Sequence, residues 1–292
     1  MVTVRDWRSD DLDWWVGLRR SWYPESGTES VIRHLASDPS VPWIGRAVAE
    51  WDGRRVGAFT IRPTPGDDPM PAAVLIVEPD VRGLHIGTTL WHRMRALVPG
   101  QRIFMAAPDR DVKSVAVLEH WGFEIVQHGI EFAYDLRRAT SRPAPLRDIS
   151  VMVIHDTELD ATGIDVDSVL LANDGPEATE LGWLFGKDEL RDQGTDLWWV
   201  VARQGDRPVA VAVADADDGV TWQLLLTAVA PGHRRRGVAR VVKTHLHAAA
   251  AAAGAQTLAT QNEEANAPIR ALNESLGYRV VGGEYRLVHP CA

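Results

Sequence analysis

Short apolar runs alternate along the chain with longer stretches whose apolar positions recur every three or four residues. In the first 138 residues, the short runs predict strands and the periodic stretches predict helices. The pair Asp52-Gly53 predicts a tight turn between two of the strands. Predicted strands are 2–5, 43–51, 56–62, 72–77, 102–106 and 130–136, and predicted helices are 10–20, 28–36, one ending near 99–100, and 111–121. This alternation is typical of the α/β class.

The second half repeats the order of the first. Its predicted strands are 150–154, 197–203, 209–214, 221–229, 257–260 and two near Tyr278 and Tyr285, and its helices are 240–254 and 267–276. Pro79 and Pro231 are 152 residues apart, and so are Arg82 and Arg234. This register indicates an internal duplication. We expect an N-terminal domain at 1–138, a proline-containing linker at 139–148 and a C-terminal domain at 149–292.

Composition narrows the classes of partner. The net charge of −9 divides into −1 for residues 1–145 and −8 for the rest, which disfavours nucleic acid. No apolar run approaches the ~20 residues of a membrane helix, and the N-terminus lacks the layout of a signal peptide. Cys291 is the single cysteine. We expect a cytoplasmic monomer or homodimer with no nucleic-acid partner, no membrane partner and no metal site.

The stretch from Val229 to Ala239 carries the clearest chemistry. It joins a predicted buried strand to a predicted helix and holds three arginines, Arg234 to Arg236, followed by Gly237. The first N–H groups of a helix lack partners inside the helix, and the helix dipole favours an anion beside them. Gly237 and Ala239 leave room for a ligand to reach the backbone, so the turn predicts a diphosphate cradle. A solvated basic turn is the alternative for this stretch taken by itself.

Two motifs in this half resemble those of the GNAT superfamily of N-acetyltransferases. Arg234-x-x-Gly237-x-Ala239, preceded by Val229-x-Pro231, is similar to that family's acetyl-CoA signature. Residues 266–278 are similar to its last helix and closing glycine–aromatic pair. The tandem layout resembles that of mycothiol synthases and of tandem acetyltransferases in actinobacterial antibiotic and other natural-product pathways. The resemblance implies two domains, each with a mixed, mostly antiparallel sheet that splays between its fourth and fifth strands.

The resemblance also implies acetyl-CoA as cofactor and a small-molecule primary amine as acceptor, which attacks the thioester directly in a ternary complex. The pantetheine arm is expected to pair with the free edge of the fourth strand near Ala228 and Val229. The residues implied in cofactor binding are Ala228, Val229, Arg234, Arg235, Arg236, Gly237, Val238, Ala239, Arg240, Asn266 and Asn273.

The chain departs from the family where a tyrosine usually serves as the acid. That position holds Asn273 in the second copy and Leu118 in the first. Asn273 is the candidate to hydrogen-bond the sulfur or hold a water, and Glu263, just after the predicted fifth strand, is a candidate base near the cleft mouth. A solvated loop carboxylate is the alternative interpretation of Glu263.

The first copy of the turn carries His85 where the second has Gly237, and we expect this copy to be degenerate and the C-terminal copy to be catalytic. The turn of the first copy is a second, weaker candidate for the cofactor site. Two alternatives stay open, a non-catalytic acyl-CoA-binding protein and an enzyme whose N-terminal copy is active. The residues of this second turn are Val77, Arg82, Gly83, Leu84, His85, Ile86, Gly87 and Thr88.

Overall fold

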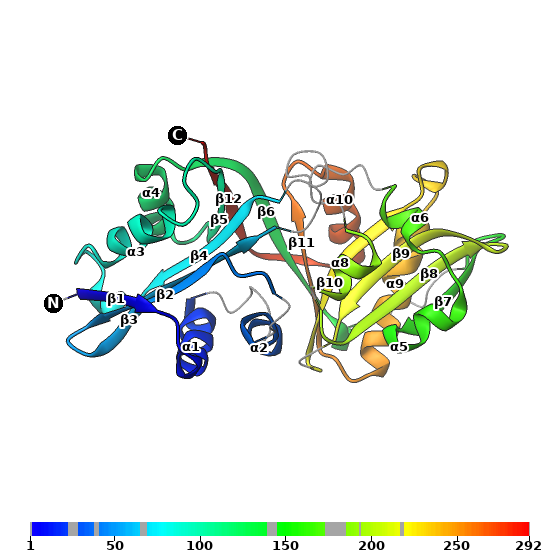
Figure 1. Cartoon of the computed structure of the whole chain (residues 1–292). Helices are drawn as coiled ribbons and strands as arrows, with labels where there is room; N and C mark the ends of the chain where they lie inside the picture. The colour runs from blue at the N-terminus through cyan, green and yellow to red at the C-terminus, as the bar shows by residue number, and fades with distance from the viewer. Residues whose placement is uncertain are drawn as a thin grey trace. The chain divides into compact units, whose positions relative to one another are not determined.

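The computed structural model describes residues 2–22, 29–37, 41–64, 69–138, 145–172, 185–192, 194–216 and 219–291 (Figure 1). The chain packs as two compact units. The N-terminal unit holds Met1–Gln127 and Glu284–Ala292, and the C-terminal unit holds His128–Gly283. Among the described helices, none is long and apolar enough to cross a membrane.

The N-terminal unit is built on a sheet in the order β1-β2-β3-β4-β5-β12. Neighbouring strands are antiparallel except β4 and β5, which run parallel and pair only at Ala72 and Phe104. The strands are β1 (Val2–Asp6), β2 (Gly45–Trp51), β3 (Arg54–Pro63), β4 (Pro71–Val77), β5 (Ile103–Pro108) and the second part of β12 (Arg279–His289). The helices are α1 (Leu12–Trp22), α2 (Glu29–Ser37), α3 (Ile86–Arg95) and α4 (Val112–His120).

Side chains of this sheet alternate between two apolar cores, as the period of a strand requires. Val48 and Ala58 pack with Trp15 of α1 on one face. Ala47 and Phe59, one residue away on the same strands, pack against α3 and α4 on the other face. α1 and α3 therefore pack on opposite faces of the neighbouring strands β2 and β3.

The C-terminal unit has the same plan, with strand order β6-β11-β10-β9-β8-β7. Its strands are β6 (Glu124–Asp135), β7 (Ser150–His155), β8 (Leu197–Gln204), β9 (Arg207–Asp215), β10 (Thr221–Val229) and β11 (Thr257–Glu263). Its helices are α5 (Asp156–Leu159), α6 (Asp167–Leu170), α8 (Lys187–Arg191), α9 (Val238–Ala252) and α10 (Ala267–Leu276). The long helix α9 buries Val242 and Leu246 against one face of the sheet. The short helices cover the opposite face, where Trp199 is wholly buried. The mixed, mostly antiparallel α/β architecture expected from the sequence is confirmed.

The two repeats exchange their last strands. Gly129–Asp135 of β6 come from the first repeat and pair with β11 in the C-terminal unit. Glu284–His289 of β12 come from the second repeat and pair with β5 in the N-terminal unit. The strands predicted near Tyr278 and Tyr285 belong to this one element, which begins at Arg279. Each sheet is thus completed by chain from the other copy.

The packing divides the chain at 127/128 and 283/284, whereas the sequence pattern places the restart of the repeat after a linker at 139–148. Both divisions coexist because the exchanged strands carry the end of each repeat into the other unit. Of the linker, residues 139–144 lie outside the described residues.

The exchange predicts that a core residue of β12 stabilises the N-terminal unit. Leu287 is fully buried among α3, α4 and β5 side chains. Leu287→Ala is expected to lower the free energy of unfolding by about 2–5 kcal/mol, because it leaves a cavity in a packed core. Val281→Ala on the same strand is the control, since Val281 is 62% exposed and its truncation is expected to change stability by less than about 0.5 kcal/mol. Denaturant unfolding measures both, and equal effects would contradict the assignment of β12 to this core.

Candidate functional site

The sheet of the C-terminal unit opens between β10 and β11. The two strands run parallel and pair from Thr221–Thr257 to Leu224–Thr260. A bulge then shifts the register of β10 against β9 between Leu224 and Leu226. A bulge bends its strand and locally disrupts pairing. Beyond it a cavity of about 500 Å³ opens between the strands and the N-termini of α9 and α10.

The β10 edge that faces this cavity has backbone groups to offer a ligand. Ala230 donates its N–H to Val209 of β9, so by strand alternation the N–H groups of Val229 and Thr227 point to the opposite edge. The Thr227 hydroxyl is buried and has no hydrogen-bond partner in the described part of the chain. An extended ligand laid along this edge would satisfy both kinds of group.

The turn from β10 into α9 has the geometry of an anion cradle. Arg235 and Gly237 adopt left-handed conformations, with φ of 62° and 80°. The first helical bond of α9 runs from Val241 to Gly237, so the N–H groups of Val238–Arg240 are left for a ligand. Among the described residues no side chain caps this end, and the first turn of α9 has no acidic residue. A Cβ at Gly237 would meet no atom of the described chain within 4 Å, so the space beside this residue is open.

The arginines of the turn divide into two roles. Arg234 donates through Nε to the Val229 carbonyl at 3.1 Å and through Nη2 to the Ala172 carbonyl at 3.2 Å. Through these hydrogen bonds Arg234 fixes the position of the turn at the end of β10. Arg235 lines the cavity and is exposed, Arg236 is exposed outside the lining, and Arg240 donates to Ser275 at 2.5 Å.

Asn266 stands at the other helix terminus of the cavity. It is the N-cap residue of α10, where its backbone oxygen accepts from Arg270, but its side chain makes no capping hydrogen bond. Asn266 and Pro268 line the cavity. The expected cofactor-binding residues in the lining are Val229, Arg234, Arg235, Gly237, Val238, Ala239, Arg240 and Asn266.

The two expected catalytic residues lie elsewhere. Asn273 is 0% exposed and Glu263 is 2% exposed, and neither lines the cavity. Glu263 ends β11 with its side chain turned inward, so it is not a carboxylate at the cleft mouth. The side chain of Ala228 is likewise buried in the core under the short helices, and by the same alternation its backbone N–H points to β9 and away from the cavity edge.

Asn273 is the centre of a buried hydrogen-bonded chain that ends at the cavity. It accepts from Lys243 Nζ at 2.7 Å and donates through Nδ2 to Asn262 Oδ1 at 2.6 Å. Asn262 lines the cavity. Lys243 is fully buried, its nitrogen lies 5.2 Å from the ring centre of Tyr278, and burial lowers its pKa to about 7.

A second buried pair lies next to this chain. His247 Nε2 and the Tyr278 hydroxyl are 2.9 Å apart, and His247 stacks on Tyr134 with ring centres 4.3 Å apart. Burial, and secondarily the charge of Lys243, lower the pKa of His247 to about 3. Burial raises the pKa of the Tyr278 hydroxyl above its usual range. His247 is therefore neutral at physiological pH.

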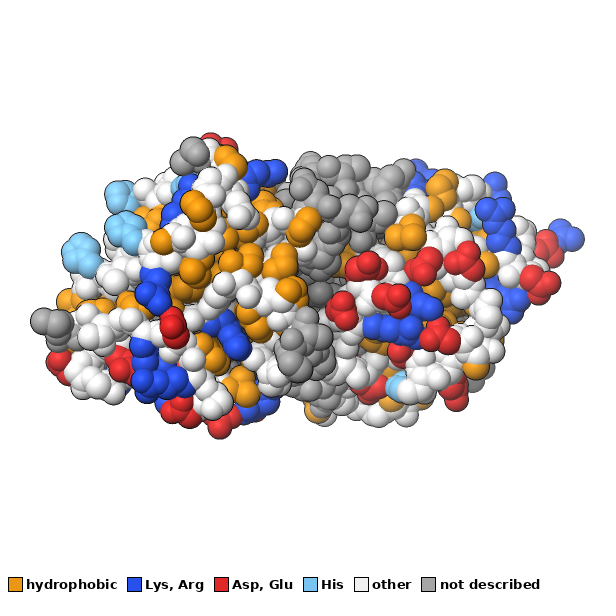
Figure 2. Space-filling view, in the orientation of Figure 1, with side chains coloured by type: hydrophobic (Ala, Val, Ile, Leu, Met, Phe, Trp, Pro, Cys, Tyr) orange, Lys and Arg blue, Asp and Glu red, His pale blue; other side chains and the backbone are white. Residues whose placement is uncertain are grey.

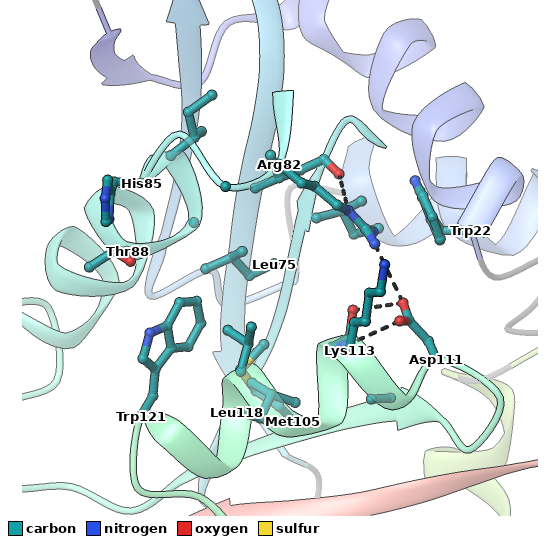
Figure 3. Close-up of a pocket in the computed structure, with 18 of the residues that line it drawn as sticks. Trp22, Leu75, Arg82, His85, Thr88, Met105, Asp111, Lys113, Leu118 and Trp121 are labelled. Atoms are coloured by element: carbon teal, nitrogen blue, oxygen red, sulfur yellow. Dashed lines mark hydrogen bonds and ion pairs between the residues drawn. The ribbon is translucent and has the colours of Figure 1, made fainter. Parts of the chain in front are cut away.

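The N-terminal unit holds a second cavity, of about 400 Å³, between β4, β5, α3 and α4 (Figure 3). Its turn matches that of the C-terminal unit: Arg82 donates to the Val77 carbonyl at 3.3 Å, and Gly83 and His85 have φ of 80° and 59°. His85 thus has the same left-handed backbone conformation as Gly237, so the histidine does not change the path of the turn. The expected residues of this turn that line the cavity are Val77, Arg82, Gly83, His85, Ile86, Gly87 and Thr88, while Leu84 is exposed outside the lining.

The surroundings of the two cavities differ. In the N-terminal unit, the Arg82 guanidinium lies 3.9 Å from the ring centre of Trp22 and 3.8 Å from Asp111, and Figure 3 shows these side chains gathered opposite His85 and Trp121. Leu118, at the position of Asn273, lines the cavity with a side chain that carries no polar atom. Figure 2 shows hydrophobic side chains gathered in the middle of this unit, and acidic ones over α5 and α8 of the other.

The comparisons with known proteins agree with this geometry. The model of the acetyltransferase (GNAT) family matches residues 3–123 and 168–278. No curated protein matches the chain. The structure is similar to a tandem GNAT protein from the clavulanic acid biosynthesis pathway, with TM-score 0.80 and 17% identity over 100% of this chain and 99% of that one.

Two other solved structures are similar in fold. A GCN5-related N-acetyltransferase from Sphaerobacter thermophilus has TM-score 0.73 and 16% identity, over 98% of this chain and 95% of that one. The GCN5-related glucosamine N-acetyltransferase region of a fungal multi-domain β-N-acetylglucosaminidase has TM-score 0.70 and 19% identity, over 99% of this chain and 38% of that one.

Sequence reasoning missed the role of Lys243 in the C-terminal site and the link between Asn262 and Asn273. Lys243 sits in a helix whose pattern marks it only as another polar position, although it is one of three lysines beside 28 arginines. Lysine can lose its proton when buried and arginine cannot, so this rare choice is the available signal. Asn262 follows the predicted end of the fifth strand, and nothing in the sequence alone joins it to Asn273.

The buried lysine predicts a pH dependence of stability. Between pH 7 and the ordinary lysine pKa of 10.5, the unfolded chain holds a proton that the folded chain has released. Unfolding therefore becomes less favourable as the pH rises through this window. The free energy of unfolding of the wild type relative to Lys243→Met is expected to rise by up to about 1.4 kcal/mol per pH unit.

Denaturant unfolding between pH 6.5 and 9.5 measures this difference. Lys113→Met is the control, because Lys113 is exposed and its removal is expected to leave the pH dependence unchanged. Parallel curves for the wild type and Lys243→Met would contradict a lowered pKa at Lys243.

Proposed function

Because the chain belongs to the GNAT family of acetyltransferases, we propose that its C-terminal unit binds acetyl-CoA and transfers the acetyl group to a primary amine of a small molecule. The observation that carries the proposal is the cradle before α9, where three uncapped N–H groups meet a left-handed glycine beside a cavity of about 500 Å³. That cradle suits a diphosphate, and the free edge of β10 suits an extended amide-containing arm.

The residues of the cavity divide the work of binding. Backbone N–H groups of Val238–Arg240 hold negative charge, with Arg235 beside them. The Val229 and Thr227 N–H groups fix an extended chain in register and orient its end toward the bulge. Bound acetyl-CoA supplies an activated acetyl thioester, and the chain supplies its position.

The transfer proposed here needs little proton chemistry from the protein. The amine nitrogen bonds to the acetyl carbon, the carbon–sulfur bond breaks with its electron pair on sulfur, and the ammonium proton passes to water. Positioning of the two reactants in one site supplies the rate enhancement. Glu263 is turned inward, so a base from this residue is not part of the proposal.

The N-terminal cavity is a second candidate for acetyl-CoA. The observation in its favour is the repetition of the turn, with Arg82, Gly83 and His85 in the conformations of their counterparts. Against it stand the imidazole at the position of Gly237 and the apolar Leu118. A protein that binds acyl-CoA without catalysis is the remaining alternative.

The likeness to a tandem GNAT protein of the clavulanic acid pathway supports a role in natural-product biosynthesis, which we place in the cytoplasm.

A charge placed in the cradle tests the proposal. Asparagine and aspartate both tolerate the left-handed conformation of Gly237, so Gly237→Asn and Gly237→Asp differ in charge alone. Gly237→Asp is expected to raise the Kd for coenzyme A about tenfold or more relative to Gly237→Asn, because a repulsion of about 1.4 kcal/mol already gives that factor. Calorimetry measures the Kd, and thiol release from acetyl-CoA with a panel of amines measures transfer.

The pair His85→Asn and His85→Asp tests in the same way whether the N-terminal cavity binds coenzyme A and supports transfer. If transfer falls in His85→Asp and survives in Gly237→Asp, the active unit is the N-terminal one. Binding of coenzyme A without thiol release for any amine would make the protein a binder.

A further inference from the structure

The buried chain from Lys243 to Asn262 has a direction. Lys243 Nζ donates to the Asn273 amide oxygen at 2.7 Å, and a lysine nitrogen keeps donor N–H groups whether it is protonated or neutral. The Asn273 nitrogen then points to Asn262, which must present its own oxygen at 2.6 Å. The Asn262 nitrogen is left over, and it donates to no atom of the described chain.

Asn262 stands level with the point where the sheet opens. The last parallel pair of β10 and β11 is Leu224–Thr260, and the bulge of β10 follows it at once. Asn262 lies two residues further along β11, on the same face as Thr260, and lines the cavity. It therefore faces the stretch around Leu226 and Thr227, where an arm laid along the β10 edge would end.

We propose that Asn262 donates an N–H hydrogen bond to the sulfur of the bound thioester and of the thiolate that leaves, and that Lys243, through Asn273, positions Asn262 to do so. The inference rests on the proposed acetyl transfer in the C-terminal cavity. Asn273 occupies the sequence position of the family's tyrosine, but it is one layer behind the cavity, and its neighbour makes the contact. No proton is transferred from Asn262: the sulfur keeps the electron pair of the broken bond and water protonates it later.

The cost of burying Lys243 supports a positioning role. A buried amine destabilises the fold unless its contacts compensate for the hydration it loses. Lys243 is fully buried, and the contacts that compensate are one amide oxygen and the face of one aromatic ring. A methionine would fill the same space without that cost. The feature that methionine lacks is the N–H donor that sets the direction of both amides.

Asn273→Asp is the most direct test, because it reverses the direction of the hydrogen bond to Asn262 and keeps a polar side chain of nearly the same size at position 273. Aspartate accepts from Lys243 and also accepts from Asn262, so Asn262 must turn its nitrogen inward and its oxygen to the cavity. The variant is expected to remain as stable as the wild type. It is expected to raise the Kd for coenzyme A about fivefold and lower turnover about tenfold to a hundredfold, as loss of one aimed donor does.

The nucleotide end of the ligand gives a readout apart from activity. Adenosine 3′,5′-bisphosphate lacks the arm and the sulfur, so its Kd is expected to be the same in the wild type, Asn273→Asp and Asn262→Leu. Coenzyme A, which carries the thiol, is expected to bind both variants more weakly than the wild type. Calorimetry with both ligands separates the sulfur contact from the cradle.

Substitutions at Lys243 separate positioning from packing. Lys243→Met is expected to reproduce the weaker binding of coenzyme A, whereas Lys243→Gln, which restores a donor, is expected to recover most of it. Leu246→Met, a core change on the same helix, controls for repacking of α9.

The outcomes are distinguishable from failure of the proposed function. If the wild type binds neither ligand, the cradle is not a coenzyme A site and the function proposal fails. If the wild type binds and transfers acetyl groups but Asn273→Asp and Asn262→Leu match it for coenzyme A, the Asn262 contact is refuted. If Lys243→Met and Lys243→Gln behave alike, Lys243 has no positioning role.

Discussion

The opening of each sheet between two parallel strands is the constraint on which the rest of the structure depends. In the C-terminal unit, β10 and β11 pair for four residues and then separate at a bulge. In the N-terminal unit, β4 and β5 pair at a single position. A parallel pair that stays closed would leave no edge, no cavity and no helix N-terminus facing one. Where the two strands separate, backbone N–H groups are exposed along the edge of one strand. The turn into the next helix brings three further N–H groups, those of the first helical turn, to the end of the same edge.

The sequence predicts the strand–turn–helix that builds the cradle because its signals are local. The strand run, the glycine of the turn and the helix start are all read within twenty residues, and the structure has β10, a turn at Gly237 and α9 there. The left-handed conformation of Gly237 is a finding of the structure. The α/β class and the repeat are also predicted, since both follow from the order of such signals. The turn itself, however, does not tell which arginine faces a ligand. Arg234 braces the end of β10 because two carbonyls lie within its reach.

Features that depend on contacts between different elements are not predicted from the sequence, and the reason is physical. The strand that completes each sheet has the same apolar pattern in both repeats, so the pattern fits a partner in its own repeat or in the other one equally well. The same limit applies to Asn273, which reads as a cleft residue from its place in the last helix. Its contacts with Lys243 and Asn262 join three separate elements, α9, β11 and α10, and only packing shows that it is enclosed.

The exchanged strands make the two repeats inseparable as folding units. The sheet of the N-terminal unit is complete only when Glu284–His289 pair with β5, and these residues are synthesised at the very end of the second repeat. A ribosome-bound chain that has emitted the first repeat therefore holds an incomplete sheet, with the edge of β5 awaiting a partner. Neither copy can be lost by a simple deletion without leaving the other unfinished. The duplication is in this way protected from reversal, even though one of its two turns has histidine where the other has glycine.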